Sequence, residues 1–146
     1  MKKIPLNDTC WPGPLSCMHT FSGFLYEGIH YRSVETFFVA MKAADRTLRP
    51  KIAAMNPFEA KKFGKQIRLR SDWLAIRDDV MAYALARKFK YDANFRDALM
   101  KTAVPIHHEN NWHDNYWGAC ICPSCRNAQK VDRLGKLLTA LRDRHL

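Results

Sequence analysis

Apolar residues recur at helical spacing along much of this chain. The longest pattern follows Ser71-Asp72 and predicts the longest helix of the fold. Its members are expected to face the core: Leu74, Ile76, Val80, Met81, Ala84, Leu85 and Phe89.

Four more segments predict helices. Ser33 suits the N-cap of a helix through Ala43. Asn56-Pro57-Phe58-Glu59 combines a capping residue, a proline at the first helical position and a glutamate three residues after the cap, and Gly64 is expected to end that helix. The other two are a segment at about 93–102, with Phe95 and Leu99 inward, and one from about Asp132, with Leu134, Leu137, Leu138 and Leu141 inward.

Strand signals are few. Phe24 to Tyr31 predicts a β-hairpin that turns at Glu27-Gly28. A short strand is expected at Val104 to His107, and a loop at 108–130. Prolines and glycines, Pro5 included, indicate an irregular segment over residues 1–23. The predicted fold is mainly α, a single domain over 1–146 with a small β-hairpin.

Length and composition agree with a globular domain. The chain has 146 residues, 47% of them hydrophobic, which suffices for a core. It contains no run of about eighteen apolar residues, so no membrane span is expected. The first eight residues carry two lysines without a long apolar segment after them, so we expect no signal peptide and a cytoplasmic location. No pattern indicates an oligomeric state.

The charge balance is strongly basic. Twenty-four Lys and Arg face fourteen Asp and Glu, for a formal net charge of +10. This favours a polyanionic partner such as nucleic acid, although a basic, solvated surface needs no partner. The densest basic segment contains Lys61, Lys62, Lys65, Arg68 and Arg70.

Three of the five cysteines form a tight cluster, Cys120-x-Cys122-x-x-Cys125. A disulfide framework is not expected in a reducing compartment. Thiolates are zinc ligands, so the cluster is a candidate structural zinc site whose fourth ligand is open among Cys17, His19, His107, His108 and His113. The alternative is three reduced cysteines that pack a loop.

Glu35 and Lys42 are candidate catalytic residues on one helix. They are seven residues apart, about two helical turns, and so share a face. Phe37 and Phe38 can raise the pKa of the Glu35 carboxyl by excluding water, as acid or base catalysis requires. Otherwise Glu35 is a solvated residue of the first helical turn, and Lys42 a surface charge or a partner for a substrate phosphate.

A second candidate stretch runs from Glu109 to Gly118. Asp114 is flanked by Trp112, Tyr116 and Trp117, and tryptophans there and at Trp73 can stack on a flat base. Each has a structural alternative: an Asx turn for Asp114, core packing for a tryptophan and simple exposure for Glu109.

Several motifs in order resemble the NADAR family, also called YbiA-like N-glycosidases. They are Pro14-Leu-Ser-Cys-Met-His19, Ser33-Val-Glu35 through Ala40-Met-Lys42, Leu69-Arg-Ser-Asp-Trp73, Arg77-Asp-Asp-Val-Met81 through Ala84-Leu to Lys88-Phe, the stretch Glu109 through Asp114 to Tyr116-Trp-Gly118, and Arg133-Leu-Gly-Lys-Leu-Leu138. The resemblance extends from about Leu15 to Arg142.

The resemblance implies cleavage of an N-glycosidic bond at C1 of a phosphorylated ribose, without a cofactor in the reaction. It makes Glu35, Lys42 and Asp114 catalytic, with Lys42 as a possible Schiff-base residue. It assigns substrate binding to Trp73, Glu109, Tyr116, Trp117 and Gly118.

The implied substrates are ADP-ribose on guanine in nucleic acid, which the basic charge favours, or a phosphorylated ribosyl small molecule such as a riboflavin-pathway intermediate. Ala119 stands where the family often has aspartate, and Thr36 where it often has histidine. The lost acid keeps a third reading open, a non-catalytic reader of ADP-ribose or nucleic acid.

Overall fold

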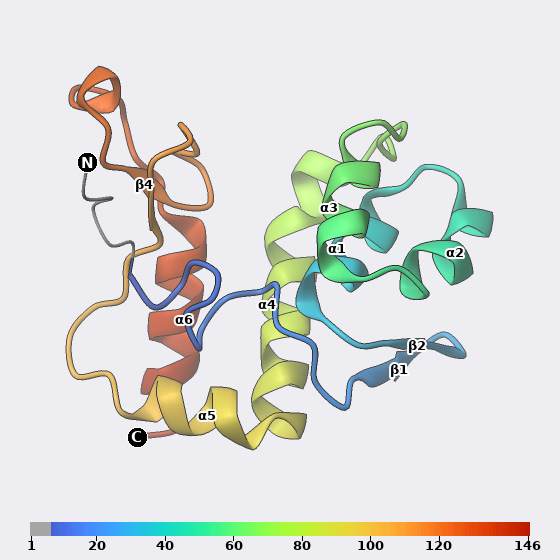
Figure 1. Cartoon of the computed structure of the whole chain (residues 1–146), viewed down its shortest axis with the longest axis horizontal. Coiled ribbons are helices and arrows are strands. Elements are labelled where there is room, and N and C mark those ends of the chain that lie inside the picture. Colours follow the sequence, from blue (N-terminus) through green and yellow to red (C-terminus); the bar gives the residue numbers. More distant parts are fainter. Residues whose placement is uncertain (1–6) are drawn as a thin grey trace. The chain divides into compact units, whose positions relative to one another are not determined.

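The computed structural model describes residues 7–146. In this part of the chain six α-helices and a small antiparallel hairpin make the fold mainly helical, as predicted (Figure 1). Residues 1–6 lie outside the described part. They include Pro5 and most of the segment that was considered as a signal peptide.

The chain divides into two compact units. The central unit is Cys17–Arg96, and the terminal unit contains residues 7–16 and 97–146. The elements are β1 (Phe24–Tyr26), β2 (Ile29–Tyr31), α1 (Val34–Lys42), the 3₁₀-helix η1 (Arg46–Leu48), α2 (Arg49–Ala53), α3 (Pro57–Gly64), α4 (Trp73–Tyr91), α5 (Ala93–Met100), β3 (Glu109–Asn110), β4 (Ala119–Cys120), the 3₁₀-helix η2 (Pro123–Cys125) and α6 (Arg133–Asp143).

The predicted hairpin is confirmed. Phe24 pairs with Tyr31 and Tyr26 with Ile29 in an antiparallel register. Glu27 and Gly28 form the turn with φ values of 48° and 78°. Two consecutive positive φ values are those of the mirror-image turns that match the twist of a two-residue hairpin.

Helix α1 is the centre of the central unit and packs against α2, α3 and α4 (Figure 1). Ser33 caps it as predicted, because its Oγ accepts a hydrogen bond from the Thr36 N–H at 3.0 Å. On its inward side Phe37 is 2% exposed. Its ring lies 5.1 to 5.7 Å from the rings of Phe24, Tyr26, Tyr31 and Tyr83.

The start of α3 is also as predicted. Asn56 and Glu59 form a reciprocal capping box, and Pro57 is the first helical residue. After α3 the chain returns along the end of α1. Arg70 N donates to Lys42 O, and Ala44 N donates to Arg68 O, both at 2.9 Å. These bonds fix the backbone on either side of Ala43.

Helix α4 corrects one predicted core residue. Met81, Ala84, Leu85 and Phe89 are buried as expected, whereas Leu74 is 73% exposed. Because α4 begins at Trp73, the tryptophan takes the inward position of the first turn. Leu74 lies about 100° further round the helix and faces water.

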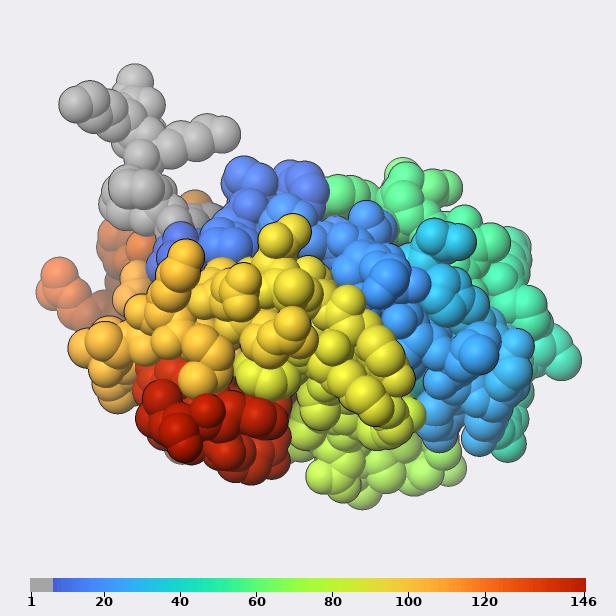
Figure 2. Space-filling view, turned by 90° about the horizontal axis from the view of Figure 1, so that it is seen from below, coloured from blue at the N-terminus to red at the C-terminus, as the bar shows by residue number. Residues whose placement is uncertain are grey.

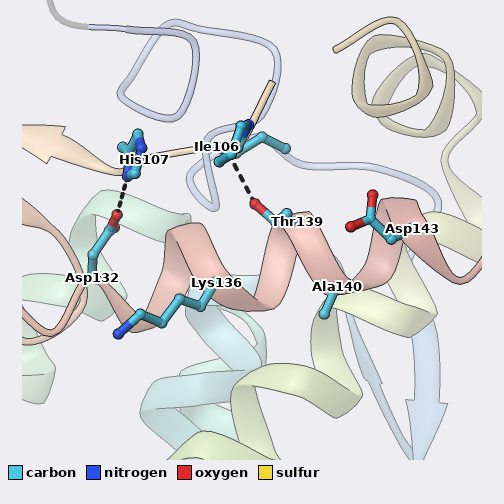
Figure 3. Close-up of a pocket in the computed structure, with 8 residues that line it drawn as sticks. Ile106, His107, Asp132, Lys136, Thr139, Ala140 and Asp143 are labelled. Atoms are coloured by element: carbon cyan, nitrogen blue, oxygen red, sulfur yellow. Dashed lines mark hydrogen bonds and ion pairs between the residues drawn. The ribbon is translucent and has the colours of Figure 1, made fainter. Parts of the chain in front are cut away.

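The terminal unit is built on α6, which buries Leu134, Leu138 and Leu141. The strand predicted at 104–107 is wrong: those residues form no strand, and β3 begins at Glu109. Pro105 has no N–H to donate to a neighbouring strand. The segment instead lies along α6, where Ile106 N donates to Thr139 Oγ1 at 2.9 Å (Figure 3).

The predicted loop at 108–130 contains one piece of regular pairing that the sequence analysis did not predict. β3 and β4 pair in parallel, with Glu109 opposite Ala119 and Asn110 opposite Cys120.

The end of α6 and the residues after it form the red surface of Figure 2. Among residues 7–146, no helix combines the length and apolar character needed to cross a bilayer.

The burial difference between Phe37 and Leu74 can be measured. We expect Phe37→Ala to lower the free energy of unfolding by about 3–5 kcal/mol, because it removes a ring from a closely packed aromatic cluster. Leu74→Ala, the matched control, is expected to change it by less than about 0.5 kcal/mol. Urea denaturation measures both. A larger loss for Leu74→Ala than for Phe37→Ala would contradict the observed orientation of these helices.

Candidate active site

One stripe of α1 stays open to solvent. Only Glu35, Phe38 and Lys42 of this helix are half-buried, and its other six residues are buried. The three recur at spacings of three and four, so they lie along one face. The sequence prediction that Glu35 and Lys42 share a face therefore agrees with the burial of α1.

Glu35 lies in the first turn of α1, where its N–H donates to Cys17 O at 3.3 Å. Burial raises the pKa of its carboxyl above the ordinary 4.5, and the ammonium groups of Lys61 and Lys42 oppose the rise without cancelling it. Glu35 is thus not the fully solvated glutamate of the structural alternative. A carboxyl that keeps its proton to higher pH suits a general acid.

Lys42 ends α1 at the other end of this stripe. Burial lowers the pKa of its ammonium below the ordinary 10.5; Glu35 opposes the shift, and Lys65 adds to it. The side chain lies against Gly64 of α3. A methyl group placed on Gly64 would be 3.0 Å from both Cε and Nζ of Lys42. Gly64 is the last residue of α3, as expected, and its missing side chain leaves room for the lysine.

The structure places three further residues near this stripe, Cys17, Lys61 and Gly64, which the sequence analysis named in other roles. Burial raises the pKa of the Cys17 thiol to about 12, against an opposing effect of Lys88. A thiol held neutral in this way is a poor nucleophile at neutral pH, so it is no rival to Glu35 and Lys42. A lone cysteine eighteen positions before Glu35 carries no sequence signal for this placement.

Trp73 lies at the start of α4 and is 5% exposed. Its ring meets Phe38 edge to face, with the centroids 4.9 Å apart. The tryptophan therefore packs behind the middle residue of the open stripe. Its predicted role in substrate stacking stays a prediction.

Asp114 is in the terminal unit, on the loop between β3 and β4. Its Oδ1 accepts the N–H groups of Tyr116 and Trp117 at 3.1 and 2.9 Å. This is the Asx turn of the structural alternative. The turn uses one carboxylate oxygen, so it does not remove the predicted catalytic role of Asp114.

The same loop caps α6. The carbonyls of Asn115, Tyr116 and Trp117 accept the N–H groups of Val131, Arg133 and Leu134 at 2.8 to 2.9 Å. Arg133 and Leu134 are the first two residues of α6, whose N–H groups have no intrahelical partner, and Val131 lies just before the helix. Asp132 makes no side-chain cap and has a φ of 51°. The loop backbone thus replaces the usual capping side chain.

The carboxylate of Asp132 has another task. Its Oδ1 accepts a hydrogen bond from His108 N at 2.9 Å, and its Oδ2 forms a hydrogen bond with His107 Nδ1 at 2.8 Å. His107 and Asp132 also line a shallow depression of about 300 Å³ beside α6, and none of its lining residues is a predicted catalytic or substrate-binding residue (Figure 3).

The remaining predicted residues of this loop have structural contacts. Tyr116 and Trp117 are half-buried and meet edge to face at 5.0 Å. Glu109 is half-buried in β3. Gly118 is buried, and a methyl group there would collide with the carbonyl of His108. The sequence analysis placed these residues in substrate binding, which stays a prediction.

The predicted cysteine cluster acquires a histidine. One ligand atom each of His113, Cys120, Cys122 and Cys125 lies within 4.8 Å of every other. His113 was one of five candidates for the fourth ligand, and the fold selects it. All three cysteines are free thiols. This group can hold a metal ion.

The predicted residues thus fall into two groups. Glu35, Lys42 and Trp73 belong to the central unit, while Asp114, the residues around it and the metal-ligand group belong to the terminal unit.

Known proteins resemble nearly the whole chain. Residues 8–145 match the family model of the NADAR domain. The N-glycosidase Npun_R5314 of Nostoc punctiforme is 31% identical over 138 residues, which span 89% of this chain and 85% of that protein. The N-glycosidase YbiA of Escherichia coli is 31% identical over 120 residues, 80% of this chain and 72% of YbiA.

The fold has a solved counterpart. The NMR structure of Escherichia coli YbiA superposes with a TM-score of 0.75 at 26% identity, covering 95% of this chain and 81% of that one. The family model, the relatives and the shared mainly helical fold lead to one conclusion: the chain belongs to the NADAR family.

Proposed function

We propose that this chain is an N-glycosidase that removes ADP-ribose from guanine in nucleic acid by hydrolysing the bond at C1 of the ribose. The observation that carries the proposal is the half-buried stripe of α1, on which burial favours a protonated Glu35 and a neutral Lys42. Its relatives of similar length bear the name N-glycosidase.

The two groups suit complementary steps. Departure of a base from C1 requires a proton on the leaving nitrogen, and a carboxyl with a raised pKa can supply it. A lysine with a lowered pKa can attack C1 as a neutral amine while the ribose ring opens. Water then hydrolyses the resulting imine, which releases the sugar aldehyde and restores the amine. In sum, one water is consumed and the free base and the free sugar are formed.

The basic charge supports a nucleic-acid substrate over a small one. Lys61, Lys62, Lys65 and Arg68 are exposed on and after α3. Arg70 is half-buried and pairs with Asp72 at 2.6 Å. The four exposed residues are the better candidates for contacts with phosphates. All four are within four residues of Gly64, which contacts Lys42.

Release of ADP-ribose tests the proposal directly. The protein is mixed with DNA that carries ADP-ribose on guanine, and the products are separated and identified by mass spectrometry. We expect free ADP-ribose and unmodified guanine DNA. Release only from free phosphoribosyl compounds would place the substrate among small molecules. Tight binding of the modified DNA without release would indicate a reader, as the alanine at position 119 allows.

Glu35→Gln is expected to lower turnover by about 10²- to 10⁴-fold, the usual contribution of general acid–base catalysis. The amide keeps the size of the side chain but cannot donate the proton. Asp79→Asn on exposed α4 surface is the matched control and should leave turnover unchanged. Single-turnover release of ADP-ribose measures both variants. Wild-type turnover in Glu35→Gln would make this residue structural.

Lys42 is expected to form a trappable adduct. Borohydride added during turnover should reduce the imine and leave an ADP-ribose mass on the peptide that contains Lys42, with no adduct in Lys42→Arg. Lys62→Arg, on the exposed side of α3, should still form it. Full turnover by Lys42→Arg without an adduct would eliminate covalent catalysis and leave hydrolysis by direct attack of water.

Salt distinguishes a polymer from a small substrate. If the four exposed basic residues contact phosphates, log affinity for modified DNA should fall linearly with log salt, with a slope of about −0.7 to −0.9 per contact. Lys62→Gln should make the slope shallower by about one contact. Titrations at several salt concentrations measure it. A flat profile would contradict a nucleic-acid partner.

A further inference from the structure

The strongest unexplained cluster of this chain is the group of His113, Cys120, Cys122 and Cys125. Nδ1 of His113 lies 3.3 Å from Sγ of Cys125, 3.4 Å from that of Cys122 and 3.9 Å from that of Cys120. Zinc bonds of about 2.3 Å to sulfur and 2.0–2.1 Å to nitrogen, at tetrahedral angles, place a nitrogen and a sulfur about 3.6 Å apart. The three observed separations bracket that value.

The four ligands come from three stretches of chain that the fold holds firmly. Cys120 belongs to β4, and its N–H donates to Asn115 Oδ1 at 2.9 Å. Cys122 precedes the short helix η2 and Cys125 is its last residue, and Cys125 N donates to Cys122 O at 3.1 Å. His113 has a φ of 68°, a conformation that turns this residue out of the regular backbone path. Cys120 and Cys125 are buried, so two of the thiols are shielded from solvent.

We propose that these four residues bind one Zn²⁺ in a closed Cys₃His site. Three thiolates and one imidazole form a donor set typical of structural zinc. With four protein ligands no position is left for water or substrate, so the ion has a structural role and takes no part in the reaction.

The position of His113 gives this zinc a specific task. Asp114 follows directly, and its carboxylate holds the N–H groups of Tyr116 and Trp117. The carbonyls of Tyr116 and Trp117 cap the beginning of α6. A metal bond at His113 therefore fixes the start of the loop that contains Asp114. The hydrogen bonds to α6 fix the residues that follow Asp114. The zinc site itself does not depend on the proposed function; only an effect on turnover through Asp114 does.

Metal content tests the site without any activity measurement. The full chain is purified under reducing conditions, equilibrated with zinc, freed of excess metal and analysed by elemental mass spectrometry. We expect one zinc per chain. Cys122→Ser should weaken zinc binding by more than about 100-fold, since even an outer partner of a ligand contributes about 10- to 100-fold. Cys10→Ser, a cysteine of the same unit that donates to Glu109 O, is the control and should retain the metal.

The histidine is tested in the same way. His113→Asn keeps a residue that tolerates positive φ and removes the imidazole ligand, so zinc binding should weaken. His145→Asn, which alters an exposed histidine after α6, should not weaken it. Cobalt bound to the wild-type chain should give tetrahedral ligand-field bands together with thiolate charge-transfer bands, a readout that needs no variant to fold.

Three results would overturn the proposal. They are a reduced chain that retains no zinc, equal loss of zinc in Cys10→Ser and Cys122→Ser, and a cobalt spectrum without thiolate bands. A zinc site found in a chain without N-glycosidase activity would leave this inference standing and would reject only the proposed function.

Discussion

Burial of the aromatic side of α1 is the constraint on which the candidate active site depends. Phe37 is enclosed by four rings of the hairpin and α4, which fixes the rotation of the helix about its axis. With that rotation fixed, Glu35, Phe38 and Lys42 are the residues left on the half-open stripe. A rotation by one residue, about 100°, would bury a charge and expose a ring. Packing of the aromatic core thus also keeps the ionisable groups of Glu35 and Lys42 partly shielded from water.

In the terminal unit, hydrogen bonds of backbone polar groups determine the conformation of the loop after Asp114 and of the beginning of α6. Asp132 is committed to His107 and His108, so α6 has no side-chain cap of its own. The loop after Asp114 supplies the missing acceptors through the carbonyls of Tyr116 and Trp117. The shape of this loop and the beginning of α6 are therefore one structural unit, and neither can change without leaving N–H groups unsatisfied.

Local signals predicted most of the helices and the hairpin. Three features that depend only on residues near in sequence are all present: the Ser33 cap, the Asn56–Glu59 capping box and the Glu27-Gly28 turn. Helix α2 has no side-chain cap, and the sequence analysis did not predict it. The two-residue strands β3 and β4 are too short to show alternation. Leu74 fits the apolar pattern of α4, yet only tertiary packing decides that Trp73 takes the inward place.

The site was predictable only in part, for the same reason. Glu35 and Lys42 share a helix, so helical periodicity is enough to place them together. Cys17, Lys61 and Gly64 reach the same neighbourhood through tertiary packing, which no local spacing encodes. Likewise the spacing of the cysteines indicates three ligands, whereas the choice of His113 among five candidates depends on the folded path of the loop.

The contact between Gly64 and Lys42 has a further consequence for the entropy of the side chain. A lysine normally samples many rotamers, and ordering it costs up to about 2 kcal/mol. Here the end of the side chain, Cε and Nζ, lies against the one position of α3 without a side chain, which limits the rotamers that the lysine can adopt in the folded protein. The ammonium group is consequently preorganised, and a substrate arriving beside it need not spend binding energy to hold it still.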